Sequence, residues 1–149
     1  MSKSQLEMVR EFHVATGSPW LPSPGVPPHD RVRLRAKLIL EEALETVGAM
    51  IGFHDEDVKR MVLRLNHLID QIDPQAQLPN VAKELNDLLY VTHGAIGEFG
   101  LPESMFEAVH ENNMSKLGGP RRSDGKQLKP EGYVKFDAAK FLAENGWAS

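Results

Sequence analysis

A chain of 149 residues with 41% hydrophobic and 26% charged side chains has the size and composition of one globular domain. Its formal net charge of −4 argues against a nucleic-acid-binding protein held by phosphate contacts, and no apolar run approaches the roughly 20 residues that span a bilayer. Because the N-terminal residues lack a signal-peptide core and cysteine is absent, we expect a single cytoplasmic domain over residues 1–149, without disulfides or thiolate metal sites.

The first part of the chain predicts two helices separated by a proline-rich segment. Ser4 and Glu7 have the spacing of a capping box that begins a helix, and Gly17 ends it. Half of the ten prolines lie in residues 18–28, so this segment is predicted to run extended. A long helix with apolar residues around much of its circumference is predicted for residues 30–52.

The rest of the chain predicts four further helices and one polar loop. The helices are expected over about residues 55–72, 79–100, 102–118 and 137–146, because each has an apolar stripe and proline, glycine or acidic residues at its ends. Residues 120–133 are polar and rich in glycine and basic residues, as in a loop. Without a repeat or a convincing strand pair, the predicted fold class is all-α, of the four-helix-bundle type.

Two clusters of carboxylates are the most informative feature of the sequence. Acids three or four positions apart share a helix face, where like charges repel. The second cluster continues an apolar stripe of its helix, so we expect its acids to point inward, where a cation must keep them charged. The clusters are Glu41, Glu42 and Glu45 in the helix of residues 30–52, and Glu84 and Asp87 in the helix of residues 79–100.

Oxygen ligands from Asp and Glu select hard cations, Mg²⁺ or Mn²⁺ rather than Zn²⁺. Such a site typically binds substrate phosphates and activates water, which suits the hydrolysis of a phosphoanhydride. Lys37, one turn before Glu41, could instead neutralise one acid. A basic loop follows the fifth helix and could hold a polyphosphate, although on its own it would be read as a solvated loop; it contains Lys116, Arg121, Arg122, Lys126 and Lys129.

At these residues the sequence resembles the all-α MazG-like nucleoside triphosphate pyrophosphohydrolases, which are related to dimeric dUTPases and phosphoribosyl-ATP pyrophosphohydrolases. The paired motif Glu-Glu-x-x-Glu and Glu-x-x-Asp stands here at Glu41 to Glu45 and Glu84 to Asp87. The segment from Val109 to Tyr133, with its Asn-Met-Ser-Lys and Asp-Gly-Lys sequences, is similar to a branch found in bacterial and phage members. Together the similar segments cover about residues 4–135.

The resemblance implies Mg²⁺-dependent cleavage of an NTP or dNTP to the monophosphate and pyrophosphate in the control of dNTP pools, with Mn²⁺ as a possible substitute. It does not decide the base of the substrate, which could be dUTP or dCTP, or a purine nucleotide such as dGTP. It implies Glu42, Glu45, Glu84 and Asp87 as metal ligands, with Glu41 orienting water or a further ion. The residues expected near the phosphates are Asn113, Lys116, Arg121, Lys126 and Tyr133.

The resemblance also bears on packing and assembly. The stretch between Glu45 and Glu84 is longer than in compact family members, and a full crossing helix there would make the two acid-bearing helices parallel, whereas the family's are antiparallel. We therefore predict that the helix after residue 55 packs to one side or at a subunit interface. A homo-oligomer is expected, with a dimer favoured and a tetramer possible. Phe12, His13 and Trp20 could wall a base pocket, although core packing suits Phe12 equally.

Two other functions fit parts of the sequence. A di-iron carboxylate protein uses inward glutamates and two Glu-x-x-His motifs, of which only Glu107 to His110 is present. A non-catalytic helical module would instead pair its acids with Lys or Arg across an interface. His93 and His110 are interpreted as packed or surface histidines rather than ligands.

Overall fold

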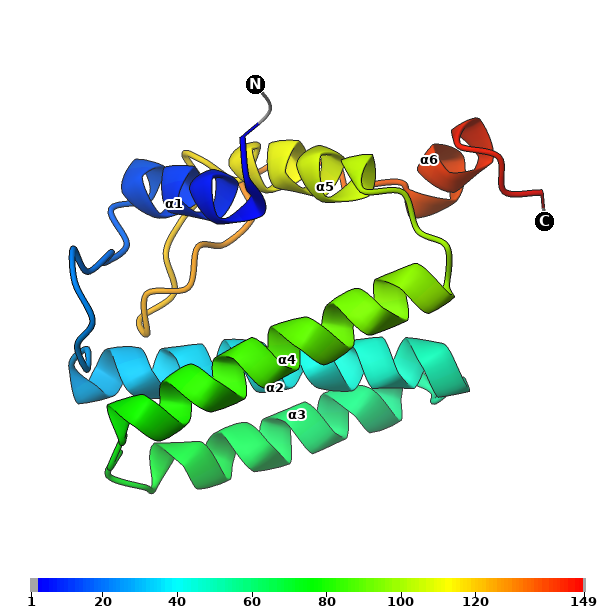
Figure 1. Ribbon diagram of the computed structural model, residues 1–149. Coiled ribbons are helices and arrows are strands. Elements are labelled where there is room, and N and C mark those ends of the chain that lie inside the picture. Colours follow the sequence, from blue (N-terminus) through cyan, green and yellow to red (C-terminus); the bar gives the residue numbers. More distant parts are fainter. Residues whose placement is uncertain (1–2, 149) are drawn as a thin grey trace. The chain divides into compact units, whose positions relative to one another are not determined.

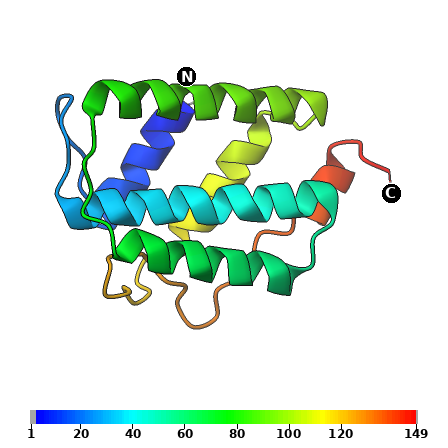
Figure 2. The same ribbon diagram turned by 90° about the horizontal axis from the view of Figure 1, so that it is seen from below.

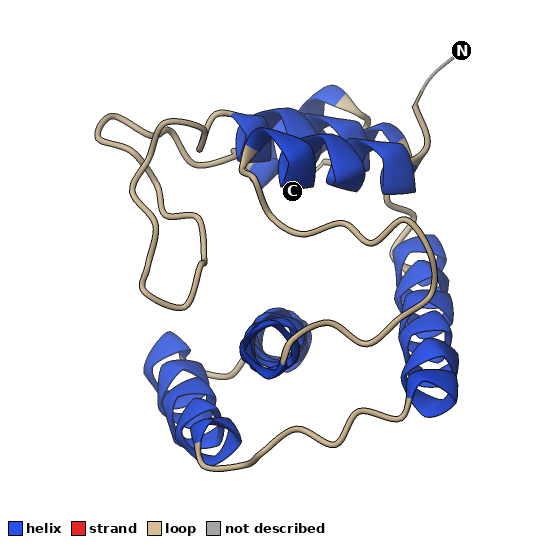
Figure 3. Cartoon of the chain, turned by 90° about the vertical axis from the view of Figure 1, so that its left-hand side faces the viewer, coloured by secondary structure: helices blue, strands red, loops and turns tan. Residues whose placement is uncertain are grey.

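The computed structural model describes residues 3–148, which form six helices joined by loops and turns (Figures 1 and 3). Within this part of the chain there is no strand, although the backbones of Arg121 and Gln127 form an isolated antiparallel β-bridge. The all-α class predicted from the sequence is therefore confirmed. The helices are α1 (Gln5–Ala15), α2 (His29–Ile51), α3 (Asp55–Asp70), α4 (Leu78–Glu98), α5 (Ser104–Met114) and α6 (Ala138–Glu144).

The described chain divides into two compact units. The middle unit is Ser23–Ala82, with α2, α3 and the first turn of α4. The terminal unit joins the chain up to Pro22 with the chain from Lys83 onward, and it holds α1, α5, α6 and the rest of α4. The boundary falls inside α4, directly before the second acid cluster. One domain over residues 1–149 stays a prediction.

In the middle unit, α2 and α3 form an antiparallel hairpin and lie side by side (Figure 2). Gly52 ends α2 with a φ of 78°, a left-handed conformation that glycine adopts without strain. Gly48 is buried against α3, and a Cβ added there would lie 2.7 Å from Val58 Cγ2. The two helices therefore approach each other closely because residue 48 has no side chain.

Polar contacts fix the far end of the same hairpin. Lys37 Nζ donates a hydrogen bond to the Asp70 carboxylate, and Arg33 Nε donates to the Ile72 carbonyl at 3.0 Å. Lys37 therefore contacts an acid of α3, a partner that was not expected from the sequence, which suggested that Lys37 could neutralise an acid of its own helix. The helix after residue 55, which we expected to one side of the acid helices or at a subunit interface, packs along α2.

In the terminal unit, α1 packs against α5 (Figure 1). The predicted capping box is present, because the Glu7 N–H donates to Ser4 Oγ at 3.3 Å and the Ser4 N–H donates to Glu7 Oε2 at 2.7 Å. The Ser4 N–H and then the Ser4 hydroxyl, which also donates to Glu7 Oε2 at 2.8 Å, lower the pKa of Glu7. Met8 is buried, and Glu11 accepts a hydrogen bond from Lys3 at 2.6 Å. The proline-rich segment after α1 contains no helix, as predicted.

Gly48→Ala is expected to destabilise the α2–α3 hairpin by about 1–3 kcal/mol, the usual cost of overpacking, because the new methyl group would overlap Val58. Gly94→Ala, on α4, is the matched control because a Cβ there meets no atom within 4 Å. This control should be neutral or stabilising by about 0.5–1 kcal/mol. Urea denaturation of the three proteins measures the difference, and a Gly48→Ala protein as stable as the wild type would contradict the packing described.

Candidate functional site

The first acid cluster lies in the middle of α2, and its acids occupy two faces. Lys37 and Gly48, which contact α3, mark the face of α2 that turns toward that helix. Glu41 lies on this same stripe and is half-buried. Glu45, one turn from both Glu41 and Glu42, lies between them around the helix, and Glu42 and Glu45 are both exposed. The middle unit therefore presents two carboxylates together, with the third beside them on the flank toward α3.

Two arginines share the face of Glu42 and Glu45. Arg31 and Arg35 are one turn apart, and the first glutamate follows Arg35 by about two turns on the same stripe. Burial, together with the positive charge of Arg31, lowers the pKa of Arg35. This face thus carries cations at one end and acids at the other, as suits a metal-bound polyphosphate. Neither arginine was predicted from the sequence as part of the site, although the spacing of both from the acids is visible there.

The second acid cluster, on α4, already shares a cation. Lys83 Nζ lies 2.6 Å from Asp87 Oδ2 and 3.1 Å from Glu84 Oε1. These hydrogen bonds, first to Asp87 and then to Glu84, raise the pKa of Lys83. The two carboxylates therefore lie close enough together for one positive group to contact both.

Within the terminal unit by itself, these acids are exposed. The Glu84 and Asp87 side chains are 72% and 59% exposed, whereas the apolar stripe had predicted that they point inward. The stripe itself is exposed too, with Leu88 at 38% and Val91 at 64%, and α4 has no buried residue. Helical periodicity correctly placed these residues on one face, but no part of residues 3–22 or 83–148, the described terminal unit, covers that face.

The two acid clusters belong to different units, so the structure describes each half of the predicted metal site by itself. Glu42 and Glu45 lie in the middle unit, and Glu84 and Asp87 lie in the terminal unit. Over residues 3–148 no group of three or more His, Asp or Glu side chains is arranged to hold a metal ion. Each half alone offers two exposed carboxylates on one face, and the composite site stays a prediction.

Three of the residues expected near the phosphates come together after α5. Asn113 Oδ1 accepts a hydrogen bond from Lys116 Nζ at 2.6 Å. The same ammonium lies 5.8 Å from the centroid of the Tyr133 ring, and Lys129 Nζ lies 5.3 Å from it. The Tyr133 hydroxyl donates to Asn112 Oδ1, a contact that the sequence did not reveal. The aromatic ring thus has two ammonium groups beside it.

The remaining basic residues lie farther along the loop. Arg122 donates to both oxygens of Asp124, at 2.9 Å and 2.6 Å, so this guanidinium has a structural partner. The Lys126 N–H also donates to Asp124, at 3.2 Å, and its side chain is half-buried. Arg121 is exposed and bridges to Gln127 through the backbone. The Arg122 guanidinium is therefore bound within its own turn, and both arginines are exposed.

Two residues of the predicted base pocket contact each other. The His13 and Trp20 rings pack edge to face, with centroids 5.3 Å apart and planes at 86°. The Pro19 carbonyl lies 3.0 Å from His13 Nδ1, which fixes the ring at the start of the proline-rich segment. Phe12 is half-buried on α1. A base pocket at this place stays a prediction.

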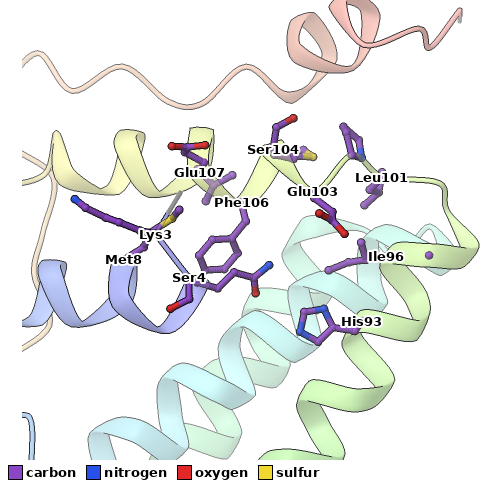
Figure 4. Close-up of a pocket in the computed structure, with 15 residues that line it drawn as sticks. Lys3, Ser4, Met8, His93, Ile96, Leu101, Glu103, Ser104, Phe106 and Glu107 are labelled. Carbon is purple, nitrogen blue, oxygen red and sulfur yellow. The ribbon is translucent and has the colours of Figure 1, made fainter. Parts of the chain in front are cut away.

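A cavity of about 800 Å³ lies elsewhere in the terminal unit, between the start of α1, the end of α4 and the start of α5 (Figure 4). Its walls combine apolar side chains such as Met8 and Phe106 with polar ones such as Lys3, Glu103 and His93. None of the residues predicted to bind metal, phosphate or base lines it. The cavity is therefore distinct from the nucleotide site predicted from the sequence.

His110, the histidine of the Glu-x-x-His motif, faces α1 instead of another acid-bearing helix. Its Nε2 lies 3.6 Å from Glu11, and only 11% of its side chain is exposed. The interpretation of His110 as a packed histidine agrees with this contact, and the contact gives the di-iron alternative no support.

Comparison with known proteins identifies the family. The profile of the phosphoribosyl-ATP pyrophosphohydrolases matches residues 9–113, which include both acid clusters. The chain belongs to this family. Because the match ends at Asn113, the rest of the basic loop lies beyond it. No curated protein matches the chain.

A solved structure extends the similarity to nearly the whole chain. The crystal structure of a candidate NTP pyrophosphohydrolase from Exiguobacterium sp. 255-15 is 26% identical, with a TM-score of 0.63. The alignment covers 97% of this chain and 94% of that one. Together the family and this structure confirm the predicted MazG-like fold and the class of enzyme, a hydrolase of phosphoanhydrides. In the described part, no helix has the length and hydropathy needed to cross a membrane.

Proposed function

We propose that this family member hydrolyses a nucleoside or deoxynucleoside triphosphate to the monophosphate and pyrophosphate, with Mg²⁺ as cofactor and Mn²⁺ as a substitute. The observation that carries the proposal is the cation shared by Glu84 and Asp87 in a chain of this family. A role in dNTP pool control, in the cytoplasm, belongs to the same proposal.

The donor set fits a hard divalent cation. Glu42 and Glu45 on α2 and Glu84 and Asp87 on α4 are all carboxylates, the ligands that Mg²⁺ prefers. Lys83 shows that the α4 pair can hold a positive group jointly. We propose these four residues as the ligands. When bound, the ion would neutralise charge on the substrate phosphates and make a bound water more acidic.

The proposed reaction is an attack of water at the α–β linkage. Glu41, at the flank of the acid face, accepts the proton of the attacking water as its oxygen bonds to one of the two phosphorus atoms. The bond between the attacked phosphorus and the bridging oxygen breaks, and its electron pair stays on that oxygen in the leaving group, which is pyrophosphate or the nucleoside monophosphate. Positive and polar groups of the loop stabilise the charge on the phosphates, and the residues proposed for this are Asn113, Lys116, Arg121, Lys126 and Tyr133.

The base is proposed to bind near the His13–Trp20 pair, with Phe12 beside it on α1. An aromatic face can stack on any base, so this pair supports binding without choosing between dUTP or dCTP and a purine such as dGTP. A panel of nucleotides therefore tests both the activity and its preference.

We expect the protein with Mg²⁺ to release pyrophosphate and monophosphate from at least one of dUTP, dCTP, dGTP and the ribonucleotides. Glu84→Gln should abolish this turnover, because it removes one charged oxygen ligand and leaves the helix unchanged. Glu98→Gln, an exposed glutamate at the end of the same helix, is the control and should keep full activity. Chromatography of the products measures the turnover of each variant, and circular dichroism measures its helicity.

Absence of turnover with every nucleotide would overturn the proposal. Full activity in Glu84→Gln would overturn the assignment of the α4 acids, whatever the substrate proves to be.

Lys83→Met is expected to strengthen Mn²⁺ binding by the nucleotide-free protein about two- to fivefold, since the ion no longer displaces an exposed ammonium from Asp87 and Glu84. Titration calorimetry measures the affinity. Lys59→Met, which removes a similar ion pair with Glu56 on α3, is the matched control and should leave the affinity unchanged. Lys83→Arg keeps the charge and should bind Mn²⁺ as the wild type does.

The same titration tests the alternative that the protein is a non-catalytic helical module. The contact of Lys83 with two acids also fits this alternative. If these acids serve only as ion-pair partners, neither the wild type nor Lys83→Met will bind Mn²⁺. Equal or weaker binding in Lys83→Met would show that the ammonium does not compete with the metal.

We also propose a homo-oligomer, with a dimer favoured over a tetramer, because α4 leaves apolar side chains uncovered in its unit. Leu85 and Leu89 lie on one flank of the helix and are 42% and 55% exposed. Burying a leucine fully contributes about 1.5–3 kcal/mol, so a second copy on this flank would be stabilised. Light scattering should give the mass of two chains, and Leu89→Glu should shift it toward one. A wild-type monomer at micromolar concentration would contradict this proposal.

A further inference from the structure

The loop between α5 and α6 closes around the side chain of Gln127. Its Nε2 group donates to the Gly119 carbonyl at 2.9 Å and to the Lys116 carbonyl at 3.1 Å. The carbonyls of Leu128 and Pro120 also lie within 3.4 Å of it. The Lys116, Gly119 and Pro120 carbonyls belong to the segment that follows α5, and the Leu128 carbonyl belongs to the returning segment. One half-buried amide therefore binds the backbone on both sides of the loop.

The backbone around this amide is tightly packed. A Cβ on Gly119 would lie 2.3 Å from the Leu128 carbonyl oxygen, so only glycine fits where the two arms cross. The Leu128 N–H donates to the Pro120 carbonyl at 2.9 Å, and the Arg122 N–H donates to the Lys126 carbonyl at 2.9 Å. The loop is thus a fixed structure with paired arms, and Gln127 fills the space between them.

Each arm carries one of the lysines proposed to bind phosphate. Lys116 provides one of the carbonyls that Gln127 binds, and Lys126 directly precedes Gln127 in the sequence. Both lysine side chains are half-buried. The Gln127 amide is neutral, so it joins these two backbone segments without forming an ion pair with either lysine.

We propose that Gln127 is a positioning residue, which holds the two lysine-bearing arms so that their ammonium groups are preorganised for the polyphosphate of the nucleotide. Preorganisation of this kind lowers the cost of binding without adding a contact to the substrate. The inference rests on the proposed function, because it takes the loop as the phosphate-binding element. Gln127 itself does not touch the substrate.

Gln127→Met tests the inference, since methionine has similar length and volume and no N–H donor. We expect KM for the preferred nucleotide to rise about tenfold, with kcat within about twofold of the wild type. A residue needed only for folding would instead lower the thermal midpoint and kcat together, with KM unchanged. Gln71→Met removes an exposed amide at the C-cap of α3, where it contacts His67, and this control should leave both constants unchanged.

Hydrogen exchange gives a readout that needs no substrate. The Leu128 amide is bonded to Pro120 across the loop, and its exchange should become about tenfold faster in Gln127→Met while the amides of α5 keep their protection. An active Gln127→Met enzyme with unchanged KM overturns the inference and leaves the proposed function intact. A wild type without turnover on any nucleotide overturns the proposed function and the inference with it.

Discussion

Carboxylates that share one face of a helix repel each other unless a cation lies beside them, and the candidate site is organised by this constraint. On α4 the constraint is met by Lys83, whose ammonium contacts both Asp87 and Glu84. On α2 the acids follow a pair of arginines on the same face. Both acid-bearing helices therefore carry positive groups on the face of their acids, beside them on α4 and about two turns away on α2, and a polyphosphate bound with a divalent ion has the complementary arrangement of charge.

Most of the fold was predictable because its signals are local. The spacing of Ser4 and Glu7 predicted a capping box that is present, and Gly52 ends α2 in the left-handed conformation that glycine favours. Close packing at Gly48 was not predictable, because it depends on Val58 from the next helix. The partner of Lys37 was likewise hidden, since Asp70 comes near it only once the hairpin has formed.

The residue types of the candidate site and the helix faces that carry its acids were predictable from the sequence. The contacts and exposure of these residues were less predictable. Periodicity placed Glu84 and Asp87 on one stripe with Val91, which is correct, but it could not show that this stripe is exposed. Gln127 gave no signal in the sequence, because its acceptors are carbonyls that a loop brings together. Arg31 and Arg35 could have been found, since their spacing from the acids is visible in the sequence alone.

The neutral character of the Gln127 attachment has a consequence for ionic strength. Salt screens charge over about 8 Å at physiological concentration, so exposed ion pairs weaken as salt is added. An amide bound to carbonyls inside a packed loop is hardly affected, because neither partner is charged. Added salt would therefore weaken the attraction of the loop lysines for phosphate while the loop keeps its shape, and lowering the salt again would restore binding without any refolding of the loop.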